Sequence, residues 1–122
     1  MKDIVIKAGD SLELKSWKEE YASVLFHLVD SNREYLAEFL NWVPNVTQES
    51  DQLKFITDSI EQLDKESGME LGIWFEGKLA GCIGLHEIDK RNNKTSIGYY
   101  LGAEFQGKGI MTKAVQALTE YC

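Results

Sequence analysis

The sequence predicts one α/β domain of the α+β type with a mixed sheet. Its elements are expected in the order strand, three helices, three strands, helix. Between residues 16 and 64, apolar residues recur at helical spacing in three segments, whereas from Met69 to Leu101 the period changes to two, as in half-buried strands. The links within the second region are short, so its strands are expected to be antiparallel neighbours. A final apolar stripe at helical spacing follows Gly109.

The first part of the chain reads as a strand followed by two helices. Residues 12–15 alternate between apolar and polar and predict a short strand. Ser16 with Glu19, and Ser31 with Glu34, have the spacing of a capping box, in which each side chain satisfies a backbone N–H at the start of a helix. We therefore expect one helix to begin near each pair.

A break and a third helix come next. Pro44 removes a backbone donor and pushes the preceding residue out of helical space, which ends the second helix. Thr47 can cap the helix that follows, whose apolar stripe runs to Leu63 before Gly68 ends it.

Three strands and a helix complete the prediction. The strands are expected at residues 69–75, 79–88 and 95–101. Glu76-Gly77 makes a tight hairpin turn between the first two. The last strand leads through Gly107 and Gly109 into a helix that begins near Gly109 and carries its apolar stripe from Ile110 to Tyr121.

The composition is that of an ordinary globular domain. Of the 122 residues, 43% are apolar and 27% charged. No apolar run approaches the roughly 18 residues of a membrane span, and the first residues lack a signal-peptide core. Cys82 and Cys122 make no disulfide framework and have no neighbours at metal-ligand spacing. We expect a cytoplasmic protein without a membrane partner or a metal.

The negative charge lies in the first half of the chain. The formal net charge is −7; residues 1–66 hold 14 acids and 7 basic residues, and residues 67–122 hold 6 of each. A nucleic-acid ligand needs a basic face, so direct nucleic-acid binding is not expected. The acidic half suits a basic partner. A solvated acidic surface that aids solubility explains the same charges.

The turn before the last helix has the features of an anion site. Two glycines permit close approach of a ligand to the backbone, and the first amides of the helix have no partner within the helix. Lys108 is followed by Gly109, so no Walker loop is present, and Thr112 stands where a dinucleotide fingerprint needs its third glycine. An ordinary strand-to-helix turn is the alternative.

The string Gln106-x-x-Gly109-x-Met111 resembles the acyl-CoA pyrophosphate loop of the GNAT superfamily of N-acyltransferases. Residues 97–101 and 105–112, with Leu40-Asn41-Trp42-Val43-Pro44, resemble more closely its Rim-type branch, which acetylates N-terminal amines of ribosomal proteins. Met111 departs from the general superfamily pattern, which has a small residue there, but is similar to this branch.

The resemblance implies acetyl-CoA (coenzyme A) as cofactor and assigns residues to it. The strand would contact the pantetheine arm, which lies in the gap beside it, and the loop would contact the pyrophosphate. The strand residues are Ile97, Gly98, Tyr99, Tyr100 and Leu101. The loop residues are Gln106, Gly107, Lys108, Gly109, Ile110, Met111 and Thr112.

The implied reaction is direct attack of a neutral amine on the thioester, which needs a proton acceptor. Several superfamily members carry a Glu where this chain has Ser96. Glu87 is our candidate for taking the proton through water, with His86 beside it. A solvated strand-end carboxylate and a surface or core histidine are the alternatives. Trp42 is a candidate substrate-side aromatic, or a packing residue at a helix end.

Three functions follow as hypotheses. The first is acetyl transfer to the N-terminal α-amine of a protein such as a ribosomal protein. The second replaces the protein with a small amine or polyamine. The third is a non-catalytic acyl-CoA-binding or interaction domain.

The end of the chain suggests an incomplete domain. The last apolar stripe runs to Tyr121, and the usual Gly, Asn or Pro stop is missing. Similar Rim-type chains continue with a strand parallel to residues 95–101, a further helix and a hairpin. We expect either a truncated GNAT domain over residues 1–122 or a homodimer in which a second copy covers the open strand edge.

Overall fold

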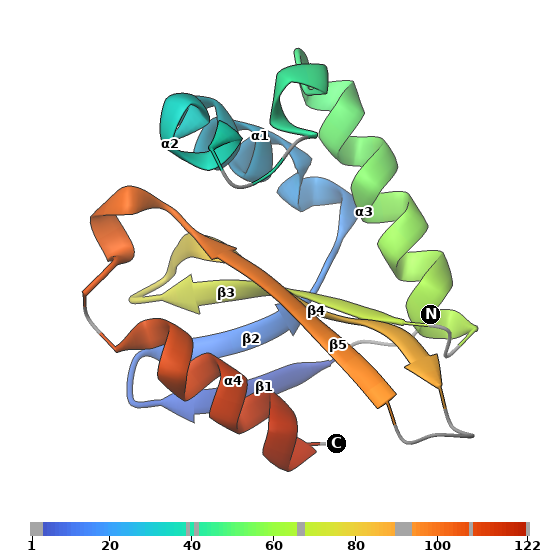
Figure 1. Ribbon diagram of the computed structural model, residues 1–122, viewed down its shortest axis with the longest axis vertical. Helices are drawn as coiled ribbons and strands as arrows, with labels where there is room; N and C mark the ends of the chain where they lie inside the picture. The colour runs from blue at the N-terminus through green and yellow to red at the C-terminus, as the bar shows by residue number, and fades with distance from the viewer. Residues whose placement is uncertain are drawn as a thin grey trace.

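A five-stranded sheet forms the centre of the molecule (Figure 1). The computed structural model describes residues 4–38, 40, 42–65, 68–89, 94–107 and 109–121; at 85–89, 94–97 and 121 it describes the backbone only. The spatial order is β1-β2-β3-β4-β5, and all four pairs are antiparallel. The strands are β1 (Val5–Gly9), β2 (Leu12–Ser16), β3 (Met69–Phe75), β4 (Lys78–Asp89) and β5 (Lys94–Leu101).

Helices cover both faces of this sheet. Helices α1, α2 and α3 lie over one face and α4 lies against the other (Figure 1). The α-helices are α1 (Ala22–Ser31), α2 (Arg33–Ala37), α3 (Glu49–Asp64) and α4 (Ile110–Tyr121). Three short 3₁₀ segments connect them, η1 (Glu19–Tyr21), η2 (Val43–Asn45) and η3 (Ala103–Phe105).

The sheet therefore separates two hydrophobic cores. Because side chains alternate along a strand, consecutive buried residues of β3 contribute to opposite faces. The core on the α4 face includes Leu14, Leu71, Ile73, Ile83, Leu101, Phe105, Ile110, Ala114 and Leu118. The core on the face of α1 to α3 includes Trp17, Leu25, Val29, Leu36, Val43, Ile56 and Cys82. Burial on both faces is what fixes the position of β3 in the middle of the sheet.

The β-region matches the sequence prediction closely. β3 spans Met69–Phe75 as predicted, and β4 and β5 each begin one residue earlier than predicted. Glu76 and Gly77 have φ of +52° and +79°, the two positive values that a two-residue type I′ hairpin requires. The link between β4 and β5 at residues 90–93 lies outside the described part of the chain.

The first strand was missed. The sequence prediction began the sheet at residue 12, but β1 precedes it and pairs with β2 from Val5 opposite Lys15 onward. Residues 8–11, predicted as a turn, are divided between the end of β1 and a shorter turn. β1 is partly exposed along its length, so its sequence lacks the apolar run of the buried strands.

Both predicted capping boxes at the first two helices were wrong. Ser16 belongs to β2, and its hydroxyl oxygen accepts a hydrogen bond from the backbone N–H of Ile4 at 2.9 Å. Ser31 is the last residue of α1, and α2 follows directly after Asn32 without a side-chain cap. Both serines have the spacing to a glutamate that is typical of a capping box. Ser16 nevertheless contributes to strand pairing, and Ser31 ends a helix.

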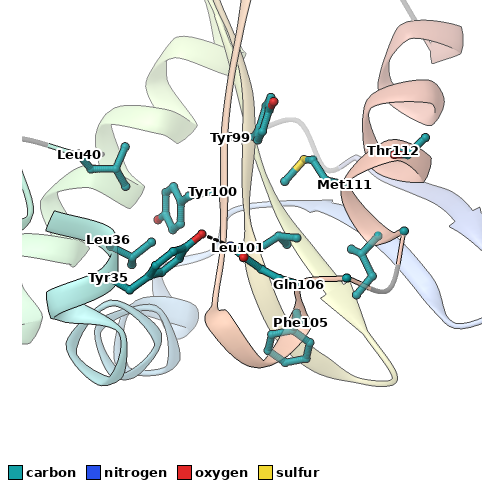
Figure 2. Close-up of a pocket in the computed structure, with 13 residues that line it drawn as sticks. Tyr35, Leu36, Leu40, Tyr99, Tyr100, Leu101, Phe105, Gln106, Met111 and Thr112 are labelled. Atoms are coloured by element: carbon teal, nitrogen blue, oxygen red, sulfur yellow. Dashed lines mark hydrogen bonds between the residues drawn. The ribbon is translucent and has the colours of Figure 1, made fainter. Parts of the chain in front are cut away.

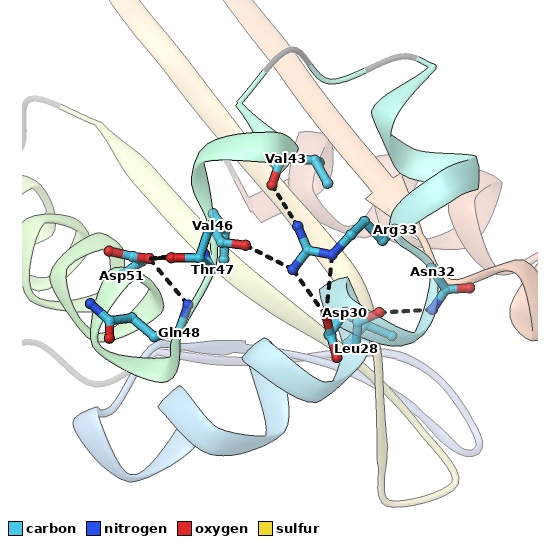
Figure 3. Close-up of polar contacts among 9 residues, drawn as sticks. All are labelled: Leu28, Asp30, Asn32, Arg33, Val43, Val46, Thr47, Gln48 and Asp51. Carbon is cyan, nitrogen blue, oxygen red and sulfur yellow. Dashed lines mark hydrogen bonds and ion pairs between the residues drawn. The ribbon is translucent and has the colours of Figure 1, made fainter.

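The predicted cap of α3 is shifted by one residue. Gln48, not Thr47, is the N-cap, and the Asp51 carboxylate provides the acceptor (Figure 3). The backbone N–H groups of Thr47 and Gln48 donate to Asp51 Oδ2 at 3.0 and 3.2 Å. These hydrogen bonds lower the pKa of the Asp51 carboxyl, the one from Thr47 having the largest effect.

Arg33 holds the segment that follows α2 (Figure 3). Its guanidinium donates to the carbonyl oxygens of Val43 at 3.0 Å and Val46 at 2.7 Å, and to Asp30 Oδ1 at 3.1 Å and 3.0 Å. The five donors of a guanidinium allow one side chain to bind all these acceptors. Arg33 therefore sets the path of the chain just beyond Trp42.

Candidate functional site: a glycine loop and two cavities beside β5

The loop between β5 and α4 has the geometry of an anion site. Gly107 and Gly109 have φ of +80° and +72°, in the left-handed region that glycine adopts without strain. A Cβ at either position would meet no atom within 4 Å, so the space beside the loop is open. The backbone N–H of Lys113 donates to the carbonyl oxygen of Gly109 at 3.2 Å. The preceding amides at the start of α4 are those that a helix leaves for a ligand.

A cavity of about 490 Å³ opens beside this loop (Figure 2). Tyr35 and Leu36 from α2 lie on one side of β5, and Met111 and Thr112 from α4 lie on the other. The cavity thus follows the side of β5 that does not pair with β4. The remaining lining residues are Leu40, Tyr99, Tyr100, Leu101, Phe105, Gln106, Gly107, Gly109 and Ile110.

Most of the residues assigned to the cofactor line this cavity. From the strand these are Tyr99, Tyr100 and Leu101, and from the loop and helix they are Gln106, Gly107, Gly109, Ile110, Met111 and Thr112. Gly98 lines a second cavity instead. Lys108 lies outside the described residues, as does the side chain of Ile97.

Two contacts connect α2 and its N-terminal flank to this loop. The side-chain amide of Gln106 donates to the hydroxyl of Tyr35 (Figure 2). The backbone N–H of Ala103 donates to Asn32 Oδ1 at 2.9 Å. Sequence reasoning missed the contributions of Tyr35, Leu36, Leu40 and Phe105 to the cavity. The apolar spacing of Tyr35, Leu36 and Leu40 predicted a helix but carried no signal of what faces that helix across the fold.

The second cavity, of about 390 Å³, adjoins the first on the helical face of the sheet. Both cavities are lined by Leu40, Tyr99 and Tyr100. Trp42 lines the second cavity, and its ring packs on that of Tyr100 with centroids 5.7 Å apart. Trp42 therefore contributes both to packing and to a cavity wall. The other lining residues are Val46, Asp51, Gln52, Phe55, Glu70, Cys82 and Gly98.

A buried carboxylate lies in this second cavity. Glu70 is 7% exposed, and the Cys82 thiol donates to its Oε2 at 3.6 Å. Burial raises the pKa of the Cys82 thiol well above its usual value, and the negative charge of Glu70 adds to this. Burial likewise raises the pKa of the Tyr100 hydroxyl, with smaller contributions from Cys82 and Glu70. Both groups are therefore neutral donors near neutral pH.

The two candidate catalytic residues can be placed only along the backbone. His86 and Glu87 belong to β4, and His86 lies opposite Ser96 of β5. Their side chains lie outside the described part of the structure. Among the side chains that are described, no group of three or more His, Cys, Asp or Glu is placed to hold a metal ion. Within the same part of the chain, no helix has the length and apolar character needed to cross a bilayer.

The fold and the loop define an anion-binding α/β domain whose cavity follows an open strand edge and ends at a helix N-terminus. The Acetyltransferase (GNAT) domain model matches residues 11–122. The chain belongs to the GNAT acetyltransferase family.

Curated and solved relatives agree with this assignment. The ribosomal-protein-serine acetyltransferase of Escherichia coli (strain K12) is 32% identical over 116 residues, which cover 95% of this chain and 65% of that protein. The microcin C7 self immunity acetyltransferase MccE, in complex with acetyl-CoA and AMP, has a TM-score of 0.91 at 34% identity, covering 94% of this chain and 64% of the other.

A third relative is the RimL ribosomal L7/L12 alpha-N-protein acetyltransferase in complex with coenzyme A. Its TM-score is 0.92 at 29% identity, covering 97% of this chain and 67% of the other. The chain therefore spans about two thirds of the length of the relatives it matches.

Proposed function

We propose that this chain binds acetyl-CoA and takes part in acetyl transfer to the N-terminal α-amine of a protein, such as a ribosomal protein. The observation that carries the proposal is the loop at Gly107 and Gly109, with its positive φ values and the open space beside it. Two relatives match almost the whole chain. One is a ribosomal-protein-serine acetyltransferase, and the other is RimL in complex with coenzyme A.

The residues present fit the pyrophosphate of the cofactor. Its negative charge would be bound by the first backbone amides of α4 and by the positive end of the helix dipole. Glycine at 107 and 109 leaves the approach free, because a Cβ there would point into the open space. Gln106 and Tyr35 from opposite walls would limit the width of the entrance.

The pantetheine arm would lie along the outer edge of β5. In the described sheet, β5 pairs with β4 on one side only, so backbone groups on its other side are open to a ligand. Tyr99 and Tyr100 project to the two faces of the strand and would enclose the arm. The bound cofactor supplies an acetyl thioester.

The chain must also receive the acceptor and take its proton. The attacking nitrogen must be a neutral amine, so the ammonium form loses a proton before attack. Glu87 remains our candidate for receiving that proton through water. The acidic first half of the chain would attract a basic acceptor.

Calorimetry with acetyl-CoA, followed by thiol release with peptide and polyamine acceptors, tests the proposal. We expect binding and release with peptides that have a free N-terminus. Release with spermidine alone would favour the small-amine function, and binding without any release would favour a non-catalytic acyl-CoA-binding domain. Absence of binding would contradict the assignment of the loop.

A further inference from the structure

The second cavity adjoins the cofactor cavity and is large compared with an acetyl group. Leu40, Tyr99 and Tyr100 line both cavities, and the second encloses about 390 Å³. An acetyl group ends in a single methyl beyond its carbonyl, so it would fill only a small part of this volume. A longer acyl group on the same cofactor would extend directly into the remaining space.

The walls of the second cavity are mainly apolar and aromatic. Val46 and Cys82 are 8% and 4% exposed, and Trp42, Phe55 and Tyr100 contribute rings. Burial raises the pKa of the Cys82 thiol well above its usual value, so this residue is uncharged and packs like a small apolar side chain. Burial of hydrocarbon against such walls is favourable in proportion to the area removed from water. The cavity therefore suits an alkyl chain.

The charged groups of this cavity exclude one kind of acyl chain. Its described lining contains the carboxylates of Asp51 and Glu70 and no basic side chain. Asp51 accepts hydrogen bonds from the backbone of Thr47 and Gln48. Glu70 accepts a hydrogen bond from the Cys82 thiol. An acyl chain that ends in a carboxylate would meet two like charges and no cation, so the chain must be uncharged.

Gly98 leaves a passage from β5 into the second cavity. Alternate residues of a strand share a face, so position 98 lies on the same face as Tyr100, which packs against the core under α1 to α3. Glycine at 98 lines the cavity without a side chain. A glycine inside a strand often marks a place where a ligand approaches the backbone closely. An acyl chain that leaves the thioester beside β5 can therefore enter the cavity at this position.

We propose that the second cavity binds the hydrocarbon chain of an uncharged acyl-CoA longer than acetyl-CoA, with the chain packed against Trp42, Val46 and Phe55. This inference rests on the proposed binding of acetyl-CoA and extends it to a further class of ligand. The pyrophosphate and the pantetheine arm would keep the positions proposed for acetyl-CoA. Only the added methylene groups would occupy the second cavity.

Calorimetry with acetyl-CoA, butyryl-CoA and hexanoyl-CoA, in the absence of an acceptor, measures the effect of chain length. We expect butyryl-CoA to bind about tenfold more tightly than acetyl-CoA, as burial of its additional methylene groups predicts. Hexanoyl-CoA should bind more tightly again. Succinyl-CoA has the length of butyryl-CoA but ends in a carboxylate, and it should bind no more tightly than acetyl-CoA.

Val46→Phe fills part of the second cavity and tests where the chain lies. The ratio of butyryl-CoA to acetyl-CoA affinity should fall close to one. Acetyl-CoA affinity should be unchanged, because Val46 lines the second cavity and not the first. Val24→Phe is the matched control and should keep the wild-type ratio, since Val24 is 37% exposed on α1 and lines a different cavity.

The fluorescence of Trp42 provides an independent readout in the wild-type chain, and it covers the case in which Val46→Phe fails to fold. Hexanoyl-CoA should change the emission more than acetyl-CoA does. Trp42→Phe should remove this difference and still bind both ligands. The other two tryptophans, Trp17 and Trp74, line neither cavity.

Any of four results would overturn the inference. These are equal affinities for acetyl-CoA and hexanoyl-CoA, a wild-type ratio in folded Val46→Phe, binding of succinyl-CoA as tight as that of butyryl-CoA, and an emission difference that persists in Trp42→Phe. In each case acetyl-CoA still binds and the proposed function stands. Failure to bind acetyl-CoA would instead reject the proposed function.

Discussion

Asn32 joins two parts of the chain that are 71 residues apart. Its Oδ1 accepts a hydrogen bond from the backbone N–H of Ala103 at 2.9 Å, and its Nδ2 donates to the carbonyl of Leu28 at 2.8 Å. One side chain thus fastens the junction of α1 and α2 to η3, the turn that precedes the glycine loop. The position of the loop depends on this junction as well as on β5.

Asn32→Ala should weaken both the fold and the cofactor site. Loss of two hydrogen bonds should lower the free energy of unfolding by about 1–3 kcal/mol, measured by chemical denaturation. We also expect acetyl-CoA affinity to fall several-fold, because η3 loses its anchor. Ser31→Ala, at the adjacent exposed residue, serves as the control. If acetyl-CoA affinity is unchanged in a destabilised Asn32→Ala protein, the junction does not position the loop.

Gly109→Val should abolish acetyl-CoA binding while the helices remain folded. At φ +72° an L-residue costs roughly 1–2 kcal/mol of backbone strain, and a branched Cβ would occupy the open space beside the loop. Calorimetry measures binding and circular dichroism measures helix content. Gly77→Val places the same strain in the distant hairpin, and it should lower stability but preserve affinity.

Tyr35→Phe should release the side chain of Gln106 without removing the ring that lines the cavity. Gln106→Ala removes the other partner. We expect each variant to change acetyl-CoA affinity by less than about tenfold, since the backbone amides of α4 provide most of the anion site. The double variant should resemble Gln106→Ala. A loss as large as that of Gly109→Val would mean that this pair, and not the backbone, dominates binding.

Glu87→Gln tests the proton acceptor. If Glu87 relays the proton, the turnover rate at neutral pH should fall by about 10²-fold or more, and acetyl-CoA affinity should stay the same. A Glu87→Gln variant with full activity would make Glu87 a surface carboxylate, and water bonded to the backbone would be the better acceptor.

Asp51→Asn should destabilise the protein in a pH-dependent way. Hydrogen bonds from Thr47 and Gln48 lower the pKa of Asp51 in the folded state from its reference value of 3.8. A carboxyl with a lowered folded-state pKa stabilises above the unfolded value, and this contribution disappears as pH falls through the folded value. The variant should therefore melt below wild type at pH 7, and the gap should narrow below about pH 4. A gap that is constant with pH would exclude the ionised carboxylate as its cause.

The sequence was sufficient for the second half of the fold and for the loop. Three local signals were enough: the change of period at Met69, the Glu76-Gly77 turn and the glycines before α4. In each case the backbone geometry is determined by the residues of that segment itself. The start of α3 was predicted within one residue because Asp51 and its neighbours interact over one helical turn. Family membership followed from the string around Gln106 and Gly109, and the GNAT domain match confirms it.

The rest depends on contacts that a sequence pattern does not contain. Ser16 fits a capping box, but its hydroxyl pairs with Ile4, which lies twelve residues earlier in the chain. Glu70 reads as an ordinary polar position in an alternating strand. Only the strand register shows that Gly84 lies opposite it on β4 and that Gly98 of β5 lies opposite Gly84. Residue type alone therefore does not reveal which carboxylate lies in a cavity.

The order of the strands in space is also their order along the chain, and this has a consequence for folding kinetics. Three of the four strand pairs join sequence neighbours through short connections, so they close with little loss of chain entropy. The contacts of Asn32 with Ala103 and of Tyr35 with Gln106 each span 71 residues. We expect the hairpins to form early and the cofactor loop to order late, so that cofactor binding mainly slows unfolding and leaves the refolding rate almost unchanged.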